Sequence, residues 1–323
     1  MVEITKRSAR TMSRMGPRPT YGQAIAAVGS VNENVIALTA DLGRSSGLDR
    51  FSKDVPSQFI NTGIAEQNMV GVAAGLARTG FDVFASTFAP FASMRASEQV
   101  RMNMGYMEEP VTLVALGSGL AMGFLGNSHF GLEDVAVMRA IPNLVVISPA
   151  DCAEIHKAVE ACVNFPKPVY IRLTGGLSAP IVYEDDYEFE IGKAVWVRKG
   201  GKTCIVSTGT SVGQSLAAAT QLGIENVDVS ILNMHTIKPL DHHALDQVGQ
   251  DFDHIFVVEE HSTIGGLGDA VVRYFNDHTN HSVKIHCHGI HDMFVPTGDY
   301  SFMLQNAKLD STGIAAFVRE ALS

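Results

Sequence analysis

Short apolar runs alternate with longer segments along the first half of the chain. The runs have the length of buried strands and occupy residues 35–40, 82–87, 111–116, 144–147 and 168–173. We predict helices between them, over residues 20–30, 90–104, 132–140 and 150–163. Strands that alternate with helices are typical of a mostly parallel sheet covered on both faces. The pattern therefore predicts a doubly wound α/β domain over residues 20–175.

A second α/β pattern follows a polar segment. Residues 176–192 contain the acidic run Glu184-Asp185-Asp186 and are typical of a linker. Beyond them, strands are predicted over residues 203–206, 227–232, 255–258 and 283–286, and helices over 211–222, 268–275 and 311–322. The predicted fold class is α/β with two doubly wound domains, the second over residues 193–323.

Composition and charge narrow the classes of partner. Hydrophobic residues make up 46% of the chain, charged residues 18%, and the net charge is −10. That charge argues against nucleic acid or an anionic membrane as the main partner. No apolar run approaches the ~20 residues of a membrane span. The four cysteines show no C-x-x-C spacing, so we expect free thiols in a reducing cytoplasm.

The N-terminal arm, residues 1–19, is basic. It carries five lysines and arginines against one acid, Glu3. A transit peptide has a similar composition. The arm is short and lacks an apolar secretory core, so we favour a surface arm or a helix that packs on a partner.

One βα unit, residues 61–91, combines an acid with two aromatic side chains. Glu66 follows a turn at Gly63 and precedes a small-residue helix, and Phe88 and Phe91 follow the next strand. A single Glu at a helix start is usually a cap or a dipole partner, and phenylalanines at this spacing are usually core. Because all three belong to one unit, they can also converge on one pocket.

Two motifs in this unit resemble the pyrimidine-binding domain of the transketolase family. The family's G-I-x-E-(Q/H) stands here as residues 63–67, and its T-F-x-x-F as residues 87–91. The resemblance extends from about Tyr21 to the C-terminus and includes the family's C-terminal domain. It covers only the second half of a full-length transketolase.

The resemblance implies a thiamine diphosphate site. Glu66 would share a proton with the pyrimidine ring of the cofactor, and a mostly apolar pocket would help it to hold that proton. Phe91 corresponds to the stacking ring and Phe88 to the pocket wall, with Ile64 as a further cofactor contact. Structural roles, a cap for Glu66 and core packing for one phenylalanine, are the alternatives.

Substrate contacts are implied by two loops. His129, preceded by Ser128, matches the family histidine that touches the substrate, where an imidazole can hydrogen-bond an oxygen or pass a proton. A loop histidine with a purely structural role is the alternative. Arg44 and Arg50 follow the first strand, and the family often places an arginine there for a substrate phosphate. A solvated surface loop would explain both arginines equally simply.

The family's magnesium and diphosphate motif, Gly-Asp-Gly followed by Asn, does not occur in this sequence. The resemblance therefore implies that Mg²⁺ and the diphosphate are held by a separate subunit, in a heterotetramer of two pairs. Residues 265–268, Gly-Gly-Leu-Gly, are a weak phosphate signal. His286, Cys287, His288 and His291 imitate a metal cluster, but side chains on a strand alternate between faces. We therefore interpret them as structural and expect no metal site in this chain.

The substrate loop departs from the family pattern. Gly117 stands where the family has its first histidine, Phe124 and Leu125 replace an acidic pair, and Phe130 replaces a glutamine. Gly175 replaces an arginine at the end of the domain. Each lost charged hydrogen bond contributes about 1.5–3 kcal/mol. Either the substrate is smaller, unphosphorylated or more apolar, which we favour, or the partner subunit supplies the missing groups.

The expected function is transfer of a two-carbon ketol unit by a split transketolase-like enzyme. The beta subunit of a 2-oxo acid dehydrogenase's decarboxylating component has similar length and architecture and is the nearest enzymatic alternative. Residues 63–67 and Ser128-His129 are closer to the transketolase branch. A non-catalytic scaffold subunit is the third hypothesis, and the intact Glu66 argues against it.

Overall fold

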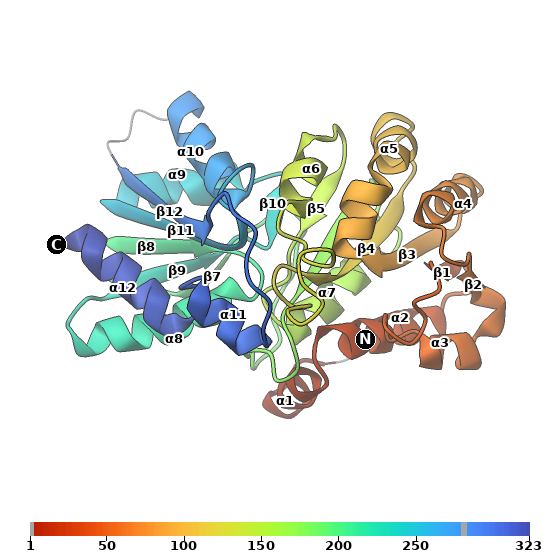
Figure 1. The fold of residues 1–323 in the computed structure, drawn as a ribbon, viewed down its shortest axis with the longest axis horizontal. Helices are drawn as coiled ribbons and strands as arrows, with labels where there is room; N and C mark the ends of the chain where they lie inside the picture. The colour runs from red at the N-terminus through yellow and green to blue at the C-terminus, as the bar shows by residue number, and fades with distance from the viewer. Residues whose placement is uncertain (1–2, 279–282) are drawn as a thin grey trace.

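The strands form two sheets within residues 3–278 and 283–323, the part of the chain that the structure, a computed structural model, describes (Figure 1). The first sheet has the order β10-β5-β6-β4-β3-β1-β2. Its strands are β1 (Val35–Thr39), β2 (Phe59–Asn61), β3 (Asp82–Phe88), β4 (Val111–Ser118), β5 (Val145–Ile147), β6 (Val169–Thr174) and β10 (Thr236–Lys238). Every pair is parallel except β10 with β5. The five strands predicted for the first domain are confirmed.

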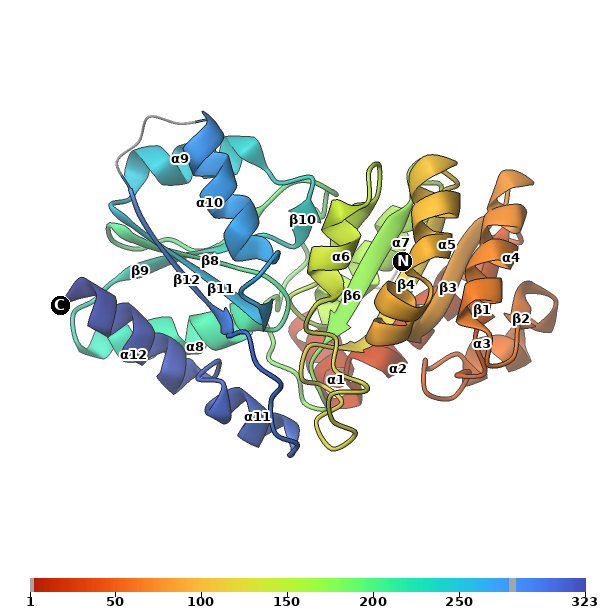
Figure 2. The same cartoon turned by 45° about the horizontal axis from the view of Figure 1, so that its top comes forward.

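Helices cover both faces of this sheet, as predicted (Figure 2). One face carries α4 (Glu66–Arg78), α5 (Ser97–Gln99) and α6 (Asp134–Ala140). The other carries α2 (Pro17–Gly29), α3 (Asp49–Asp54), which the short η1 (Pro56–Gln58) follows, and α7 (Cys152–Cys162). Because both faces are covered, the central strands are buried along their whole length; every residue of β1, β4 and β6 is buried.

The helix predicted over residues 90–104 contains wide, π-helical turns. It consists of η2 (Phe91–Arg95), α5 and η3 (Val100–Tyr106). The amide of Ala96 donates to the carbonyl of Phe91 at 3.1 Å, a bond five residues long. Such turns are rare and frequently occur at functional sites, and η2 contributes two side chains to the site below.

The second sheet has the order β12-β11-β8-β9-β7. Its strands are β7 (Val195–Arg198), β8 (Thr203–Ser207), β9 (Val229–Asn233), β11 (His254–Ser262) and β12 (Lys284–Ile290). Its helices are α8 (Ser211–Ile224), α9 (His242–Asp251), α10 (Leu267–His278), α11 (Tyr300–Asn306) and α12 (Ser311–Leu322). On β12, His286 stacks on Phe256 with ring centroids 4.7 Å apart, and His288 Nε2 is 2.8 Å from the carbonyl oxygen of Lys308. Both side chains have structural neighbours.

Strand β10 joins the two domains. It follows β9 in the chain but pairs with β5 of the first sheet, with Thr236 opposite Ile147. The amide of Ser148 donates to the carbonyl of His235 at 2.7 Å and extends this connection. One hydrophobic core contains Val146 and Ile237 together with Leu232 of the second sheet. The second domain thus supplies the edge strand of the first sheet.

The N-terminal arm forms α1 (Lys6–Met15), which packs on its own chain. A capping box between Thr5 and Ser8 begins this helix. Met12 is buried in the core, and the hydroxyl of Ser13 donates to the carbonyl of Ala179 at 2.5 Å. The basic side chains of α1 are exposed, and its buried side packs against α2, α7 and the predicted linker.

All four cysteines are unpaired thiols, three of them buried and Cys287 exposed. Among the helices of residues 3–278 and 283–323, none combines the length and the apolar character needed to cross a membrane.

Candidate active site

The predicted site residues meet at the carboxyl ends of β3 and β4. Phe88 is the last residue of β3, and Phe91 lies in η2 one turn later. Glu66 is the first residue of α4, and His129 comes from the loop that follows β4. Open α/β sheets place ligands at this edge. The structure brings together all four residues that the motifs single out.

Glu66 is buried and forms an ion pair. Its side chain is 4% exposed, and its Oε1 accepts a hydrogen bond from Arg95 Nη1 at 2.8 Å. We expected mostly apolar surroundings for this carboxyl group, but the structure places the guanidinium of Arg95 against it. Among the described residues Arg95 is the hydrogen-bond partner of this carboxylate, and Oε2 is left for a ligand.

Arg95 links the acid to the aromatic side chains. Its guanidinium carbon lies 3.9 Å above the centre of the Phe91 ring, and its carbonyl accepts from Gln67 at 3.3 Å. The side chain of Arg95 is 48% exposed. The sequence analysis missed this residue; its position four residues after Phe91 in a predicted helix was the available signal.

Three rings form a half-open cluster next to this ion pair. The ring centres of Phe88 and Phe91 are 5.9 Å apart, and His129 lies 5.6 Å from Phe88 and 5.3 Å from Phe91. All three contacts are edge-to-face. His129 is half-buried, and its Nδ1 lies 3.0 Å from the hydroxyl of Ser128. The Ser128–Nδ1 contact orients the ring and leaves Nε2 for another partner.

Apolar side chains are exposed around the cluster. Ile64, in the turn before Glu66, is 79% exposed, as expected of a side chain that awaits a contact rather than one in a core. Met94 in η2 and Phe124 in the loop are exposed as well. Large apolar side chains that surround a site in this way mark a protein or ligand contact surface.

A cavity of about 330 Å³ lies beside Phe88 and contains two arginines. Arg44, one of the two candidates from the sequence, lines it together with Arg18, which the sequence analysis counted only as part of the basic arm. Burial lowers the pKa of Arg18, which is half-buried. Arg50 points elsewhere: its guanidinium pairs with Asp54 on α3 at 3.0 Å.

This cavity is also lined by the two positions at which the chain lacks a histidine and an arginine of the family pattern. Gly117 and Gly175 both border it. A Cβ atom at Gly117 would lie 2.7 Å from the side chain of Met122, and the φ of Gly117 is +62°. Met122 therefore fills the space that a larger side chain at position 117 would need.

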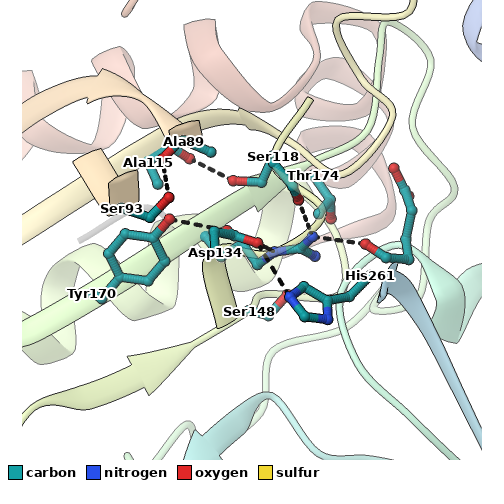
Figure 3. A network of polar contacts seen from close by, with 12 residues as sticks. Ala89, Ser93, Ala115, Ser118, Asp134, Ser148, Tyr170, Thr174 and His261 are labelled. Atoms are coloured by element: carbon teal, nitrogen blue, oxygen red, sulfur yellow. Dashed lines mark hydrogen bonds and ion pairs between the residues drawn. The ribbon is translucent and has the colours of Figure 1, made fainter. Parts of the chain in front are cut away.

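A buried polar network lies behind the site, between the domains. Arg172 and Asp134 form an ion pair at 3.0 Å with both side chains at most 1% exposed, and Tyr170 donates to Asp134 at 2.9 Å. Arg172 also donates to the carbonyls of Gly131 and Glu260. Figure 3 shows that Asp134 contacts both Tyr170 and His261, and His261 comes from the C-terminal domain.

Burial changes the proton affinity of this network. It lowers the pKa of His261 to about 4 and raises the pKa of Glu259 to about 7. The Glu259 carboxylate accepts from the amides of Leu267 and Gly268 at 2.7 and 2.8 Å. The glycine-rich segment predicted as a weak phosphate signal is thus bound to an acid of its own chain.

The two α/β domains place an acid and an aromatic cluster together at the carboxyl edge of the first sheet. Residues 15–179 match the family model of the transketolase pyrimidine binding domain, and residues 192–314 match that of the transketolase C-terminal domain. The chain therefore belongs to the transketolase family.

Relatives of similar length support this assignment. A putative transketolase C-terminal section from Methanocaldococcus jannaschii is 38% identical over 309 residues, which cover 95% of this chain and 96% of that protein. A subunit of apulose-4-phosphate transketolase from Phocaeicola vulgatus is 34% identical over 298 residues, covering 92% and 94%. A solved structure described as a split gene transketolase, inactive beta4 tetramer, has a TM-score of 0.85 and 36% identity, covering 94% and 97%.

The residues at the site fit the pyrimidine half of thiamine diphosphate, the cofactor that the family implies. The ring cluster offers apolar edges and faces, and the Glu66 carboxylate has one oxygen, Oε2, left to meet a ring nitrogen. Both groups stand at the open edge of the sheet.

Proposed function

We propose that this chain is the pyrimidine-binding subunit of a split transketolase. Together with a diphosphate-binding partner subunit it transfers a two-carbon ketol unit from a ketose to an aldehyde. Two such pairs form a cytoplasmic heterotetramer. The observation that carries this proposal is the meeting of Glu66, Phe91 and His129 at one open edge. The P. vulgatus relative, named as one subunit of its enzyme, and the beta4 relative, described as inactive, support the need for a second subunit.

The residues of this chain would divide the work. Thiamine diphosphate, when bound, supplies a nucleophilic ring carbon, and its magnesium and diphosphate would be held by the partner subunit. Glu66 would hold a proton at a pyrimidine nitrogen, and Phe88 and Phe91 would hold the ring by contacts of about 0.5–1.5 kcal/mol per aromatic pair. His129 Nε2 would hydrogen-bond an oxygen of the substrate. Ile64 and Met94 would be covered by cofactor or partner.

We also propose that the substrate carries an anionic group, because Arg18 and Arg44 line one cavity. Two guanidiniums in one cavity attract a phosphate or a sulfonate. The P. vulgatus relative is named for a phosphorylated sugar. We therefore propose an anionic sugar as substrate, in place of the unphosphorylated one that the loss of the family histidine and arginine had favoured.

Calorimetry tests the proposal. Thiamine diphosphate with magnesium is titrated into the chain alone and into the chain mixed with its candidate partner, and turnover of the mixture is measured. We expect binding only in the mixture, and a loss of turnover of about 100- to 10,000-fold for Glu66→Ala. Glu225→Ala, which removes an exposed acid paired with Arg319 in the second domain, is the control.

Other outcomes would reject the proposal. Tight binding to the chain alone would mean that this chain holds the diphosphate itself. Turnover that depends on a lipoyl group would favour the 2-oxo acid dehydrogenase. A complex without binding or turnover would favour the scaffold.

The substrate class is tested separately. Arg18→Ala and Arg44→Ala should each raise the KM for a phosphorylated ketose by about 10- to 150-fold, equivalent to a lost charged hydrogen bond. The KM for an uncharged ketose should stay constant. Equal effects on both substrates would contradict an anion site.

A further inference from the structure

The loop that carries His129 is closed at its base. Gly119 and Gly131 exchange two backbone hydrogen bonds of 2.9 and 3.2 Å, so the residues between them form a pinched loop. A Cβ atom at Gly131 would lie 2.6 Å from Ala89, between the two phenylalanines of the site. The base of the loop thus packs directly against the aromatic motif.

The C-terminal domain holds this base through Glu260. The Glu260 side chain is buried, and its Oε1 accepts a hydrogen bond from the amide of Leu120 at 2.7 Å. Its Oε2 accepts from the hydroxyls of Thr210 at 2.8 Å and Tyr300 at 2.6 Å. A Cβ atom at Gly119 would lie only 2.2 Å from Oε1. The Glu260 carboxylate therefore packs so closely against the loop that no side chain can be accommodated at Gly119.

Further contacts bind the loop and the cavity wall to the same domain. The amide of Gly298 donates to the carbonyl of Gly123 at 3.2 Å, and Asn127 donates to the carbonyl of Val295 at 3.0 Å. The amide of Thr210 donates to the hydroxyl of Thr174 at 3.2 Å, one residue before the cavity-lining Gly175. Glu260 therefore stands at the point where the loop, α11 and the end of β6 meet.

We propose that Glu260 is a positioning residue that places His129 and the wall of the substrate cavity for the reaction. The proposal rests on the proposed function and extends it: the C-terminal domain becomes part of the scaffold of the active site. A carboxylate that accepts three hydrogen bonds in a buried place holds its partners rigidly, because breaking any bond leaves a buried polar group unpaired. The loop has a tip exposed at Phe124, so its position depends on these tethers.

Substitutions of Glu260 in the complex with its partner subunit test this role. Glu260→Ala removes all three bonds and should lower kcat by about 100-fold, the effect of a misplacement near 1 Å. The Kd for thiamine diphosphate should change much less than kcat, by no more than the about 0.5–1.5 kcal/mol of an aromatic contact, because Glu66 and Phe91 lie outside the loop. Glu260→Gln keeps an oxygen for Leu120 and should restore most of kcat. Gly119→Ala should reproduce the Glu260→Ala defect.

The chain contains a matched control. Glu154 is another buried carboxylate, and it accepts from the amide of Ala150 at 2.6 Å and from the hydroxyl of Tyr187 at 2.7 Å. It lies on α7, and its partners belong to the segment just before α7, to the linker and to β9. Glu154→Ala should lower Tm as Glu260→Ala does but leave kcat unchanged.

A second readout uses the chain alone, so the proposal is decided even if the complex shows no turnover. Hydrogen exchange of the peptide containing residues 117–131, and the NMR signal of the His129 ring, should change in Glu260→Ala and remain like wild type in Glu260→Gln and Glu154→Ala. If the complex shows no turnover but hydrogen exchange and the His129 signal change in Glu260→Ala, the proposed function is rejected. The conclusion that Glu260 positions the loop would then still stand. Unchanged exchange, or an unchanged kcat with a lower Tm, would overturn the positioning role.

Discussion

The open cluster around Glu66 and the buried network around Arg172 use the same kinds of side chain in opposite ways. Each contains a carboxylate–guanidinium pair and aromatic rings. Arg172 and Asp134 are buried between the two domains. Arg95 is half exposed, and Ile64, in the turn before Glu66, is 79% exposed. The network pairs the charges of Arg172 and Asp134 within the chain. The cluster leaves ring edges and a carboxylate oxygen for another molecule.

This difference separates stability from binding. Substitution of a residue in the buried network should mainly lower the free energy of unfolding, because water cannot reach the partners that are left unpaired. A residue of the open cluster should affect ligand binding with little effect on folding. The predictions below test this division, starting with the largest expected effect.

Removing the acid of the network should cause the largest loss of stability. Asp134→Ala leaves the buried Arg172 charge without its partner and should lower the free energy of unfolding by about 3–5 kcal/mol. Denaturant unfolding of the chain measures it. A loss below about 1 kcal/mol, the range of exposed pairs, would mean that water reaches the network and that the two regions do not differ.

The network should also make stability fall in acid. Burial lowers the pKa of His261 to about 4, against about 6.5 in the unfolded chain. The folded state therefore binds fewer protons between these values, so stability is complete above pH 6.5 and is lost as pH falls to 4. At 1.36 kcal/mol per pKa unit the loss is about 3 kcal/mol.

His261→Gln isolates this contribution. The raised pKa of Glu259 acts in the opposite direction, since a protonated carboxyl favours the folded state below pH 7, but Glu259 is present in both proteins. Wild type should therefore lose about 3 kcal/mol more than His261→Gln between pH 7 and pH 4 in denaturant unfolding. Parallel pH profiles would contradict a neutral, buried His261.

A change in the open cluster should act on the ligand instead. Phe91→Leu keeps an apolar side chain but loses the ring contacts to Phe88 and His129, so the complex should bind thiamine diphosphate more weakly by about 0.5–1.5 kcal/mol. Calorimetry on the complex measures the affinity, and unfolding of the chain alone provides the control. A stability loss larger than the affinity loss would assign Phe91 to the core.

The smallest effect is expected for Arg50. Its pair with Asp54 is exposed and spans four residues of one helix, and such pairs contribute about 0.3–0.5 kcal/mol. Arg50→Ala should leave the KM for an anionic ketose at the wild-type value. If it instead raised that KM as Arg44→Ala is expected to, the anion cavity would extend beyond its present lining.

The sequence predicted the open cluster well and the sealed network hardly at all. Glu66, Phe88 and Phe91 lie in one βα unit, so a local pattern could bring them together. Arg172 and Asp134 are 38 residues apart, and Glu260 meets Leu120 across 140 residues. No periodicity or motif encodes such pairs, because they depend on how two domains pack. The same reason hid Arg18, which reaches the cavity from the arm.

Most element types were predictable from the apolar runs. The central strands and most of the long helices were confirmed, while the short strands β2, β7 and β10 and the helix α9 were missed. Runs of three or four residues carry little periodic signal. The π-helical turns of η2 also have no sequence pattern that distinguishes them from an ordinary helix. These turns place the guanidinium of Arg95 over the ring of Phe91 and against the carboxylate of Glu66.

Strand β10 makes the two family domains inseparable in practice. It covers the side of β5 that does not face β6. A polypeptide cut after residue 192 would lose this cover and present a row of unpaired amides and carbonyls, the kind of edge on which chains aggregate. We therefore expect the isolated first domain to precipitate or to pair with itself. We therefore expect the boundary between the two family domains to divide two sequence families but not two units that fold on their own.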